Sequence, residues 1–423
     1  MFPRFVQVHT LTSFAAGLLN RDDAGFAKRI PFGSAVRTRV SSQCLKRHWR
    51  RFQGPQALGA LGVPMSIRSR HTLEERLVRP LVEEDHLGQP LARAIVDYLA
   101  SEVLGESAKA KAEKAKASAQ EGESGEAPMT GQVTVLGQKE LDYLREQARK
   151  IAGKKPDPKK VKDAAKEILG KDGLANLRTM TLGAGLDAAL FGRMVTSDIL
   201  ARCDAAIHVA HAFTVHKEQR EDDYFTAVDD LRSDEGKQGA GHVNSNELTS
   251  GLFYGYVVAD VPLLVSNLTG CKVQDWEKAD HQLSGRVIES LVHLIATVSP
   301  GAKLGSTAPH SLAHAVLVEA GSGQPCTLAN AFLDPVPLTD DVVGNAYAAL
   351  AQEILDLDIN YTSNKPSRAH MARGKESRYE QLATVLKKTG GEEKKLQVAL
   401  GQRLSLDDLA KWASTCVTTG VQA

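Results

Sequence analysis

The stretch that decides the fold is Ser41-Ser42-Gln43-Cys44-Leu45-Lys46-Arg47-His48-Trp49-Arg50-Arg51-Phe52. The two serines at its start offer hydroxyl groups to the unpaired N–H groups of a first helical turn, so the stretch predicts a helix. At the helical angle of about 100° per residue, its apolar and polar residues fall on opposite faces. The apolar face consists of Leu45, Trp49 and Phe52, and the polar face of Gln43, Lys46, Arg47 and Arg50. One side is therefore suited to burial and the other to contact with an anion.

This helix lies in a segment, residues 24–72, that contains ten Lys or Arg residues and no Asp or Glu. The whole chain of 423 residues has a formal net charge of only +1. Positive charge is thus concentrated locally, and we expect any polyanion to bind at one face or groove rather than over the whole surface. The ten cations are Lys28, Arg29, Arg37, Arg39, Lys46, Arg47, Arg50, Arg51, Arg68 and Arg70.

Bulk properties limit the class of protein. A length of 423 residues with 42% apolar residues suits one large domain with insertions, or two to three domains. Five cysteines are scattered without a Cys-x-x-Cys pair, which favours reduced thiols in a cytoplasm over a zinc site. No apolar run is long enough to cross a membrane, so we expect a cytoplasmic protein with no membrane partner.

The chain begins with a strand pattern. Residues 5–11 are rich in β-branched and aromatic residues and nearly free of charge, which predicts a first strand in the centre of a sheet. Residues 36–40 predict a second strand, in which alternation places Arg37 and Arg39 on the same side. The basic helix follows directly.

Two later segments alternate as strands and are predicted to pair with each other, residues 205–216 and residues 249–259. About thirty polar residues separate them, far more than the roughly two to five of a usual hairpin loop. We therefore expect a projecting ribbon over residues 217–248. It carries Tyr224 and Phe225, which would either stack on nucleic-acid bases or anchor the ribbon to protein.

Residues 73–182 differ in composition and predict a helical insertion, with Leu and Ile at helical spacing. Its middle, residues 107–128, is a low-complexity run of Ala, Lys, Glu, Ser and Gly. A second basic cluster follows it, and this cluster is either a solvated helix face or a nucleic-acid contact. Its lysines are Lys154, Lys155, Lys159, Lys160, Lys162 and Lys166.

Histidine chemistry remains an open alternative. His9, at the first strand, could act as a general base, although a buried histidine with a backbone partner fits the pattern better. His208, His211 and His216 lie close in sequence, but on a strand His211 faces away from the other two, which disfavours a metal site.

Two further segments carry weaker signals. Asp22 and Asp23 could hold a divalent cation or orient an attacking hydroxyl, but capping a turn or pairing with an arginine is favoured. The glycine-containing turn at residues 300–307 could bind phosphate through backbone N–H groups and Lys303. The sequence contains no nucleophile elbow, Walker loop, dinucleotide fingerprint or zinc spacing.

Five separated motifs together resemble the CasC family, the backbone subunit of the type I-E CRISPR surveillance complex Cascade, which belongs to the RAMP superfamily. They occur in the family's order and span almost the whole chain. The motifs are Leu19-Asn20-Arg21-Asp22-Asp23, Arg39-Val40-Ser41-Ser42-Gln43-Cys44-Leu45-Lys46-Arg47, Gly192-Arg193-Met194, Tyr224-Phe225-Thr226-Ala227-Val228-Asp229-Asp230-Leu231 and Pro300-Gly301-Ala302-Lys303.

The resemblance implies an α+β fold shaped like a hand. An RRM-like (ferredoxin-like) palm would comprise residues 1–72 and 183–423, helical fingers residues 73–182, and a β-hairpin thumb residues 217–248. Several copies, a hexamer in the family's pattern, would stack head-to-tail along one CRISPR RNA. The protein would not be an enzyme and would need no cofactor or metal.

The resemblance also implies site residues and partners. The partners would be CRISPR RNA, target DNA through the guide, further copies of the chain and other Cascade subunits. Fingers lysines Lys159, Lys160, Lys162 and Lys166 would contact target DNA. The predicted RNA-binding residues are Asn20, Arg21, Lys28, Arg37, Arg39, Ser41, Gln43, Lys46, Arg47, Arg50 and Lys303, with nucleotide wedges at Met194, Tyr224, Phe225 and Thr226.

Two enzymatic alternatives remain. One is a RAMP endoribonuclease that cuts CRISPR RNA precursors with a histidine such as His9. The other is metal-dependent cleavage of paired RNA by Asp22 or Asp23.

Overall fold

The structure is a computed structural model that describes residues 1–104, 133–170, 173–180, 182–193, 200, 203–228, 240–302, 304–363, 365–389 and 392–421. The low-complexity run at 107–128 therefore lies outside the described residues. The chain divides into two compact units. Unit 1 comprises Met1–Leu58, His208–Val261 and His281–Ala423, and unit 2 comprises Gly59–Ile207 and Pro262–Asp280. These divisions fall at residues 58 and 207, whereas the sequence placed the helical insertion at residues 73–182.

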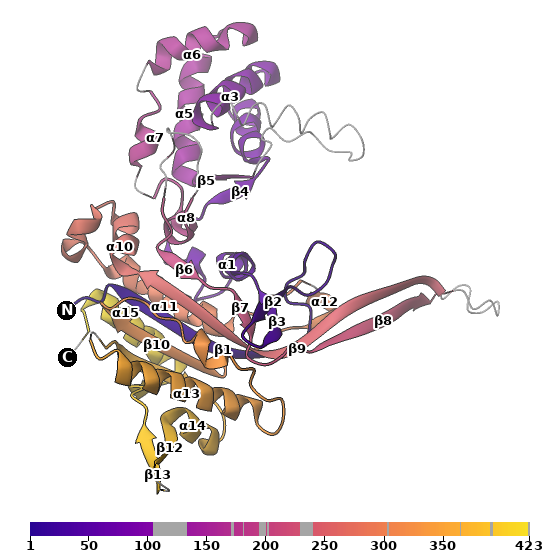
Figure 1. Ribbon diagram of the computed structural model, residues 1–423. Coiled ribbons are helices and arrows are strands. Elements are labelled where there is room, and N and C mark those ends of the chain that lie inside the picture. The colour runs from indigo at the N-terminus through magenta and orange to yellow at the C-terminus, as the bar shows by residue number, and fades with distance from the viewer. Residues whose placement is uncertain are drawn as a thin grey trace. The chain divides into compact units, whose positions relative to one another are not determined.

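A large mixed sheet forms the centre of unit 1 (Figure 1). Strand β1 (Phe5–Gly17) pairs antiparallel with β10 (Ala315–Gly321) on one side and β9 (Ala240–Asp260) on the other, so Val8 lies between Val318 and Val257. The prediction of a central first strand is confirmed. The strand order is β14-β11-β10-β1-β9-β7-β3-β2, with β2 at Arg29–Phe32, β3 at Ala35–Val40, β7 at Ala212–Thr214, β11 at Ser367–Ala372 and β14 at Gln402–Arg403.

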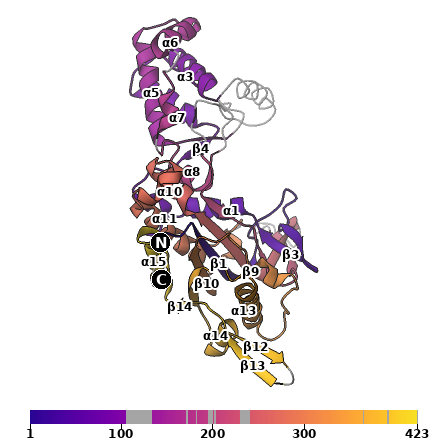
Figure 2. The same ribbon diagram turned by 60° about the vertical axis from the view of Figure 1, so that its left-hand side comes forward.

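Alternation along β1 separates the two faces of this sheet. Leu11 packs in the core with Leu317, Tyr254 and Tyr347, the last from α13 (Val342–Asn360). Phe14 instead packs with Val40 and Leu45. The first face is covered by α13 and α14 (Glu376–Ala383), and the second by α1 (Ser42–Arg51), α11 (Gln282–Thr297) and α15 (Leu406–Thr418) (Figures 1 and 2).

The basic helix α1 forms where the sequence predicts it. The Ser41 hydroxyl accepts a hydrogen bond from Cys44 N (3.3 Å) and caps the first turn. Trp49 is only 2% exposed and fixes the helix on the sheet, while Leu45 and Phe52 are half-buried. Burial of this aromatic side chain stabilises the docking that a ten-residue helix needs, since such short helices are marginal in isolation.

The strand predicted at residues 205–216 is interrupted. It forms β6 (Ile207–Val209) and β7, which are separated at Ala210 and His211. Both short strands pair with β9, the strand that contains the predicted partner segment, and β7 does so through Phe213 and Thr214. Strand β9 pairs over a longer stretch with β1, from Phe5 opposite Asp260 to Gly17 opposite Thr249.

The predicted ribbon is present as a hairpin. Strand β8 (Arg220–Val228) pairs with residues 240–249 of β9, and both strands extend beyond the rest of the sheet (Figure 1). Residues 229–239 lie outside the described residues. Arg29 holds the hairpin's base, because it donates to Glu218 (2.5 Å) and to the buried Glu247 (2.6 Å).

The remaining short elements of unit 1 lie around these layers. A separate two-stranded hairpin consists of β12 (Thr384–Thr389) and β13 (Glu392–Gln397). Helix α12 (Leu304–Thr307) is a single turn, and a 3₁₀ helix (Ala329–Phe332) occurs before α13. A further 3₁₀ helix (Leu58–Leu61) lies at the division between the two units.

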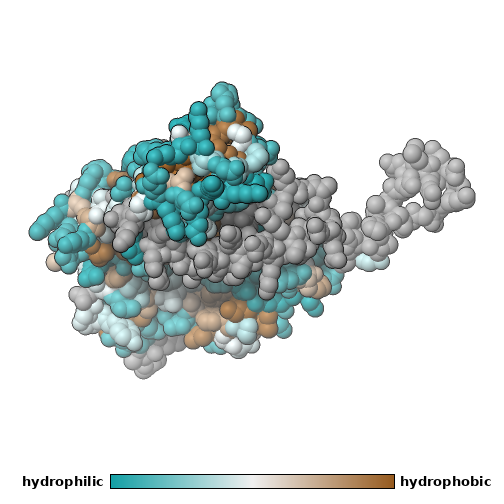
Figure 3. Space-filling view, turned by 90° about the horizontal axis from the view of Figure 1, so that it is seen from above, coloured by the Kyte–Doolittle hydropathy of each residue, from teal (hydrophilic) through white to brown (hydrophobic). Residues whose placement is uncertain are grey.

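Unit 2 is mainly helical, as the composition of the insertion predicts. Leu77, Leu81, Ile95 and Leu99 are buried together in its core. In Figure 3 the described surface seen from above carries mostly hydrophilic residues. Its elements are β4 (Ile67–Ser69), a π-helix (Glu74–Val78), α2 (Arg79–Glu83), α3 (Gln89–Leu104), β5 (Thr134–Leu136), α5 (Gln138–Gly153), a 3₁₀ turn (Pro158–Lys160), α6 (Val161–Leu169), α7 (Asn176–Thr179), α8 (Leu186–Phe191), most of α10 (Val261–Thr269) and a 3₁₀ helix (Val273–Lys278).

These layers give a mixed α+β architecture, so the predicted fold class is confirmed at that level. The more detailed assignment of an RRM-like palm stays a prediction. Within the described part of the chain, no helix has the length and apolar character needed to cross a membrane.

Candidate nucleic-acid interface

Three chain segments meet at the N-terminal end of α1. Asn20 Oδ1 accepts a hydrogen bond from Ser41 N (2.9 Å), and Asn20 O accepts one from Lys28 N (2.9 Å). Arg39 N in turn donates to Lys28 O (2.8 Å). The loop after β1, strand β3 and the helix cap are therefore held together. Four predicted RNA-binding residues, Asn20, Lys28, Arg39 and Ser41, lie in one site.

A fourth segment, the loop after α11, docks on the same helix. His48 Nδ1 donates to Cys44 O (2.8 Å), which leaves Nε2 to accept from Gly301 N (3.3 Å). Ala302 N donates to Leu18 O (2.8 Å). The predicted phosphate-binding turn thus lies beside α1, although Lys303 itself is outside the described residues.

The site is electropositive. Arg39 donates from Nη1 to Nδ1 of His211 (2.6 Å). Burial lowers the pKa of His211, and the charges of Arg39, Lys28 and Lys46 lower it further. Three cations from a loop, a strand and a helix therefore act on one imidazole ring. We name Lys28, Arg39, Lys46 and His211 the basic cluster.

Most of the predicted RNA-binding side chains in this site reach solvent. Arg21, Gln43 and Arg47 are exposed, while Ser41 is buried as the helix cap. The others, Asn20, Lys28, Arg39, Lys46 and Arg50, are half-buried. The outer side of α1 is thus polar and cationic, whereas Trp49 fills its inner side.

Arg37 is predicted to bind RNA at this interface. The prediction is wrong about where the side chain lies, because it is in the interior of unit 1. Its side chain is fully buried, and it donates to Thr214 O (3.0 Å) and Phe332 O (2.7 Å). Burial lowers the pKa of this guanidinium. Backbone carbonyls rather than phosphates accept from its two Nη atoms, while its Nε is buried with no hydrogen-bond partner among the described residues. Arg37 therefore joins β3 to β7 and to the 3₁₀ helix before α13.

The hairpin residues are only partly described. Tyr224 on β8 is 70% exposed, so its ring is accessible to a ligand. Phe225 and Thr226 pair through their backbones with Asn244 and Val243, but their side chains lie outside what the structure describes. Met194 also lies outside the described residues.

The predicted DNA-binding lysines lie in unit 2. Lys159 and Lys160 end the 3₁₀ turn that Asp157 caps, and Lys162 and Lys166 lie on α6. All four side chains are exposed. The opposite face of α6 is buried through Val161, Ala165 and Leu169, so the helix presents its lysines outward.

Of the residues named in the two enzymatic alternatives, His9 and Asp22 are engaged within the fold, whereas Asp23 is exposed. His9 is 2% exposed and its ring nitrogens contact Tyr254 OH (2.9 Å) and Glu319 Oε2 (3.2 Å). Asp22 Oδ1 accepts from the backbone N–H groups of Ala24 (3.0 Å) and Phe26 (2.9 Å). The partner of His9 is thus a carboxylate rather than the backbone group that the sequence favoured, whereas Asp22 caps a turn as favoured.

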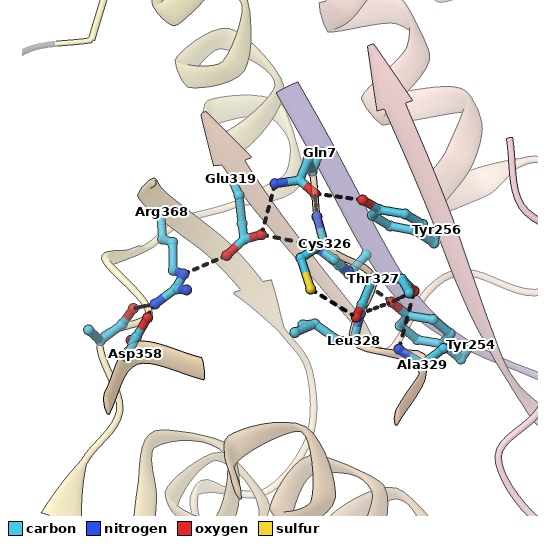
Figure 4. Close-up of polar contacts among 12 residues, drawn as sticks. Gln7, Tyr254, Tyr256, Glu319, Cys326, Thr327, Leu328, Ala329, Asp358 and Arg368 are labelled. Atoms are coloured by element: carbon cyan, nitrogen blue, oxygen red, sulfur yellow. Dashed lines mark hydrogen bonds and ion pairs between the residues drawn. The ribbon is translucent and has the colours of Figure 1, made fainter. Parts of the chain in front are cut away.

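The sequence reasoning missed the network around Glu319, on the sheet face that α13 covers (Figure 4). Arg368 donates to Glu319 (2.6 Å) and to Asp358 (2.6 Å), and Gln7 donates to Glu319 (3.3 Å). Burial would raise the pKa of Glu319, but the hydrogen bond and charge of His9 and the charge of Arg368 lower it to about 2. A lone glutamate in the otherwise apolar strand AVLVEAG is the signal that could have revealed this network.

Among the described side chains, no group of three or more His, Cys, Asp or Glu residues is arranged to hold a metal ion. His208 is exposed, His211 contacts Arg39, and His216 Nδ1 donates to Lys217 O (2.7 Å) while its Nε2 accepts from Leu252 N (3.1 Å). The three imidazole rings therefore do not converge on one point.

The fold and this site define a class of α+β protein that presents a basic helix and an extended hairpin from one mixed sheet. The chain belongs to the family of CT1975-like proteins, which it matches over residues 6–397.

Two solved structures are similar in fold. A chain titled "CRISPR RNA-guided surveillance complex, pre-nicking" is 24% identical, with a TM-score of 0.74 and coverage of 99% of this chain and 100% of that one. Another, titled "CRISPR RNA-guided surveillance complex", is 20% identical, with a TM-score of 0.53 and coverage of 97% and 99%. A comparison with curated proteins gives no match.

Proposed function

We propose that this chain is a subunit of a CRISPR RNA-guided surveillance complex and that it holds the phosphate backbone of the guide RNA. The proposal extends to the type I-E complex, in which the chain would be the non-catalytic backbone subunit of the CasC type. The family match and the titles of the two similar structures support the first statement. The five sequence motifs support the second.

The observation that carries the proposal is the basic cluster at α1. Burial lowers the pKa of His211, and the charges of Arg39, Lys28 and Lys46 lower it further. No Asp or Glu occurs between residues 24 and 72. Cations held close together attract an anion. An RNA backbone supplies closely spaced phosphates, and such contacts position the strand without reading its sequence. Sequence recognition would then be left to base pairing by the guide.

Repetition along the RNA follows from the geometry of such a subunit. If each copy contacts the next through unlike surfaces, the contact is open and generates a helical filament that other subunits must end. The exposed Tyr224 on the projecting hairpin would contact the RNA segment of a neighbouring copy. The exposed lysines of α6 would contact target DNA paired with the guide. A cytoplasmic location would suit these partners.

The proposal includes no catalytic step. A general base must reach its substrate, yet His9 is 2% exposed and contacts Tyr254 and Glu319. These contacts disfavour the endoribonuclease alternative. Incubation with a hairpin RNA precursor gives the direct test, since specific cleavage that His9→Ala abolishes would contradict a structural role.

The main test replaces two cations of α1. We expect Lys46→Ala with Arg50→Ala to weaken binding to single-stranded RNA of every sequence. The slope of log affinity against log salt should become shallower by about 0.7 for each lost phosphate contact. Fluorescence anisotropy over a series of salt concentrations measures both effects, and circular dichroism checks that the fold is retained.

A matched control removes the same charge elsewhere. Lys387 and Lys394 lie directly opposite each other on the β12–β13 hairpin, and both are exposed. Lys387→Ala with Lys394→Ala should leave RNA affinity and its salt slope close to those of the unaltered protein. Equal losses of RNA affinity in the two double variants would mean that net charge alone determines binding. Electron microscopy of the protein on a long guide RNA tests the filament, because isolated particles without a repeat would contradict a backbone role.

A further inference from the structure

The loop between β1 and β2 is closed by hydrogen bonds between its two sides. Lys28 N donates to Asn20 O (2.9 Å), and Arg21 and Ala27 form an antiparallel bridge inside that pair. Asp22 N donates to Phe26 O (2.8 Å), while Asp22 Oδ1 accepts from Phe26 N (2.9 Å). Successive rungs of hydrogen bonds thus fix residues 20–28 as a miniature hairpin, and Asn20 connects this hairpin to the cap of α1.

This closed loop presents an aromatic ring to solvent. Phe26 is 49% exposed, and it is the only exposed phenylalanine among the described side chains. Ala27 beside it is buried, so the backbone is anchored while the ring faces outward. Figures 1 and 2 both place the indigo loop after β1 on the same side of the sheet as α1.

The charges around Phe26 differ from those around α1. Arg21 is exposed on one strand of the loop, and Lys28 on the other belongs to the basic cluster. Asp23 at the tip is exposed, and Asp22 uses Oδ1 inside the loop. A phosphate would be attracted to the Arg21 and Lys28 edge but repelled by the carboxylates at the tip. The ring of Phe26 therefore suits a neutral, flat group.

We propose that Phe26 is a stacking platform for one nucleobase of single-stranded RNA, while Arg21 and Lys28 hold the flanking phosphates. This inference rests on the proposed RNA-binding function and adds a base contact to it. Aromatic rings accept any base, because every base has a π-face, so the contact orders the strand without selecting sequence. Orienting one base at a fixed distance from the phosphate contacts at α1 would help to present the guide in a regular conformation.

The test compares RNA with and without bases. Fluorescence anisotropy measures binding to an oligonucleotide short enough to hold one protein chain, and to an abasic ribose-phosphate strand of the same length. We expect Phe26→Ala to weaken binding to the normal RNA by about fivefold or more, the range that alanine substitution of a stacked aromatic gives. Binding to the abasic strand should change little.

Two further variants test whether the loss of affinity is specific to an aromatic ring at position 26. Phe26→Trp should retain affinity and show quenching of its added fluorescence when RNA binds, because a base then stacks on the indole. Tyr361→Ala is the matched control, since Tyr361 is 73% exposed at the end of α13 on the other face of the sheet. This control should leave RNA affinity unchanged.

The outcomes separate this inference from the function on which it rests. If the unaltered protein binds neither strand in a salt-dependent manner, the proposed RNA-binding function fails. If it binds and Phe26→Ala weakens both strands equally or neither, only the stacking proposal is overturned. If Phe26→Ala spares the short RNA but impairs assembly of several chains on a long one, Phe26 contacts a second copy and the proposal is also overturned.

Discussion

Unit 1 contains two sets of charged side chains, the network around Glu319 and the basic cluster beside α1, and they differ in composition. On the face under α13, Glu319 contacts His9 and Arg368, and Arg368 also contacts Asp358. Beside α1, the three cations Lys28, Arg39 and Lys46 act on His211, and all three come from a stretch of sequence that lacks carboxylates. The first set includes two carboxylates, whereas the second consists of three cations and an imidazole ring.

This difference shows how to separate structural from functional charges. Removing one member of a buried, balanced network leaves another charge uncompensated, so the cost falls on folding. Removing a half-buried cation from the α1 face changes the attraction for phosphate and leaves folding less affected. Substitutions in the network under α13 should therefore change the free energy of unfolding, whereas substitutions in the basic cluster beside α1 should change RNA affinity.

The largest effect is expected from Glu319→Ala. The carboxylate is buried with Arg368 and His9, and loss of one partner from such a network costs about 3–5 kcal/mol. Urea denaturation measures the free energy of unfolding. RNA affinity below the transition should stay unchanged, because Glu319 lies on the face opposite α1. A parallel loss of affinity in folded protein would break the distinction between the two faces.

Glu376→Gln provides the matched control for this prediction. Glu376 contacts Arg403 at 3.2 Å, but its side chain is 71% exposed. Exposed pairs of this kind contribute about 0–1 kcal/mol. A loss in Glu376→Gln as large as in Glu319→Ala would indicate that burial does not determine the cost.

Acidification should lower the free energy of unfolding through the same network, with a smaller effect than Glu319→Ala. The pKa of Glu319 is lowered from 4.5 to about 2 in the folded chain. Its contribution to stability is therefore complete above the unfolded pKa and is lost as the pH falls from 4.5 to about 2. The unfolded state binds the proton first over this range, and the loss amounts to about 3 kcal/mol. Denaturation curves at several pH values should show it, and Glu319→Gln should flatten this part of the profile.

Local patterns predicted the parts of this molecule that depend on neighbouring residues. The cap at Ser41, the buried Trp49, the central β1 and the hairpin after His216 all follow from capping, periodicity or loop length. The basic face of α1 was predictable for the same reason, because helical spacing determines which side chains share a side.

Contacts between distant residues could not be predicted in this way. Alternation placed Arg37 and Arg39 on one side of a strand, but it could not show that Phe332, 295 positions away, supplies a carbonyl to Arg37. His9 and Glu319 meet across 310 positions because β1 and β10 are neighbours in the sheet. The break at Ala210 and His211 was likewise not predictable from alternation, because it separates two short strands that both pair with β9.

The smallest expected effect is a change in the pKa of His211, which belongs to the basic cluster. Its pKa is lowered by burial and by Arg39, Lys28 and Lys46 in the free protein. RNA phosphates near these cations would stabilise the protonated ring, so binding should raise the pKa of His211. A phosphate oxygen between Arg39 and His211 would accept a hydrogen bond from each.

The sign of the pH dependence follows from linkage. Binding that raises a pKa takes up protons, so affinity for RNA should increase as the pH falls toward the pKa of the free protein, which lies below 6.5. A rise of one unit corresponds to about a tenfold gain at acid pH. Proton NMR of the imidazole with and without RNA measures the shift, and His211→Gln should remove its share of the pH dependence. A pKa that stays constant or falls on binding would show that no phosphate lies near this ring, and the comparison between the two faces would then need a different anion site.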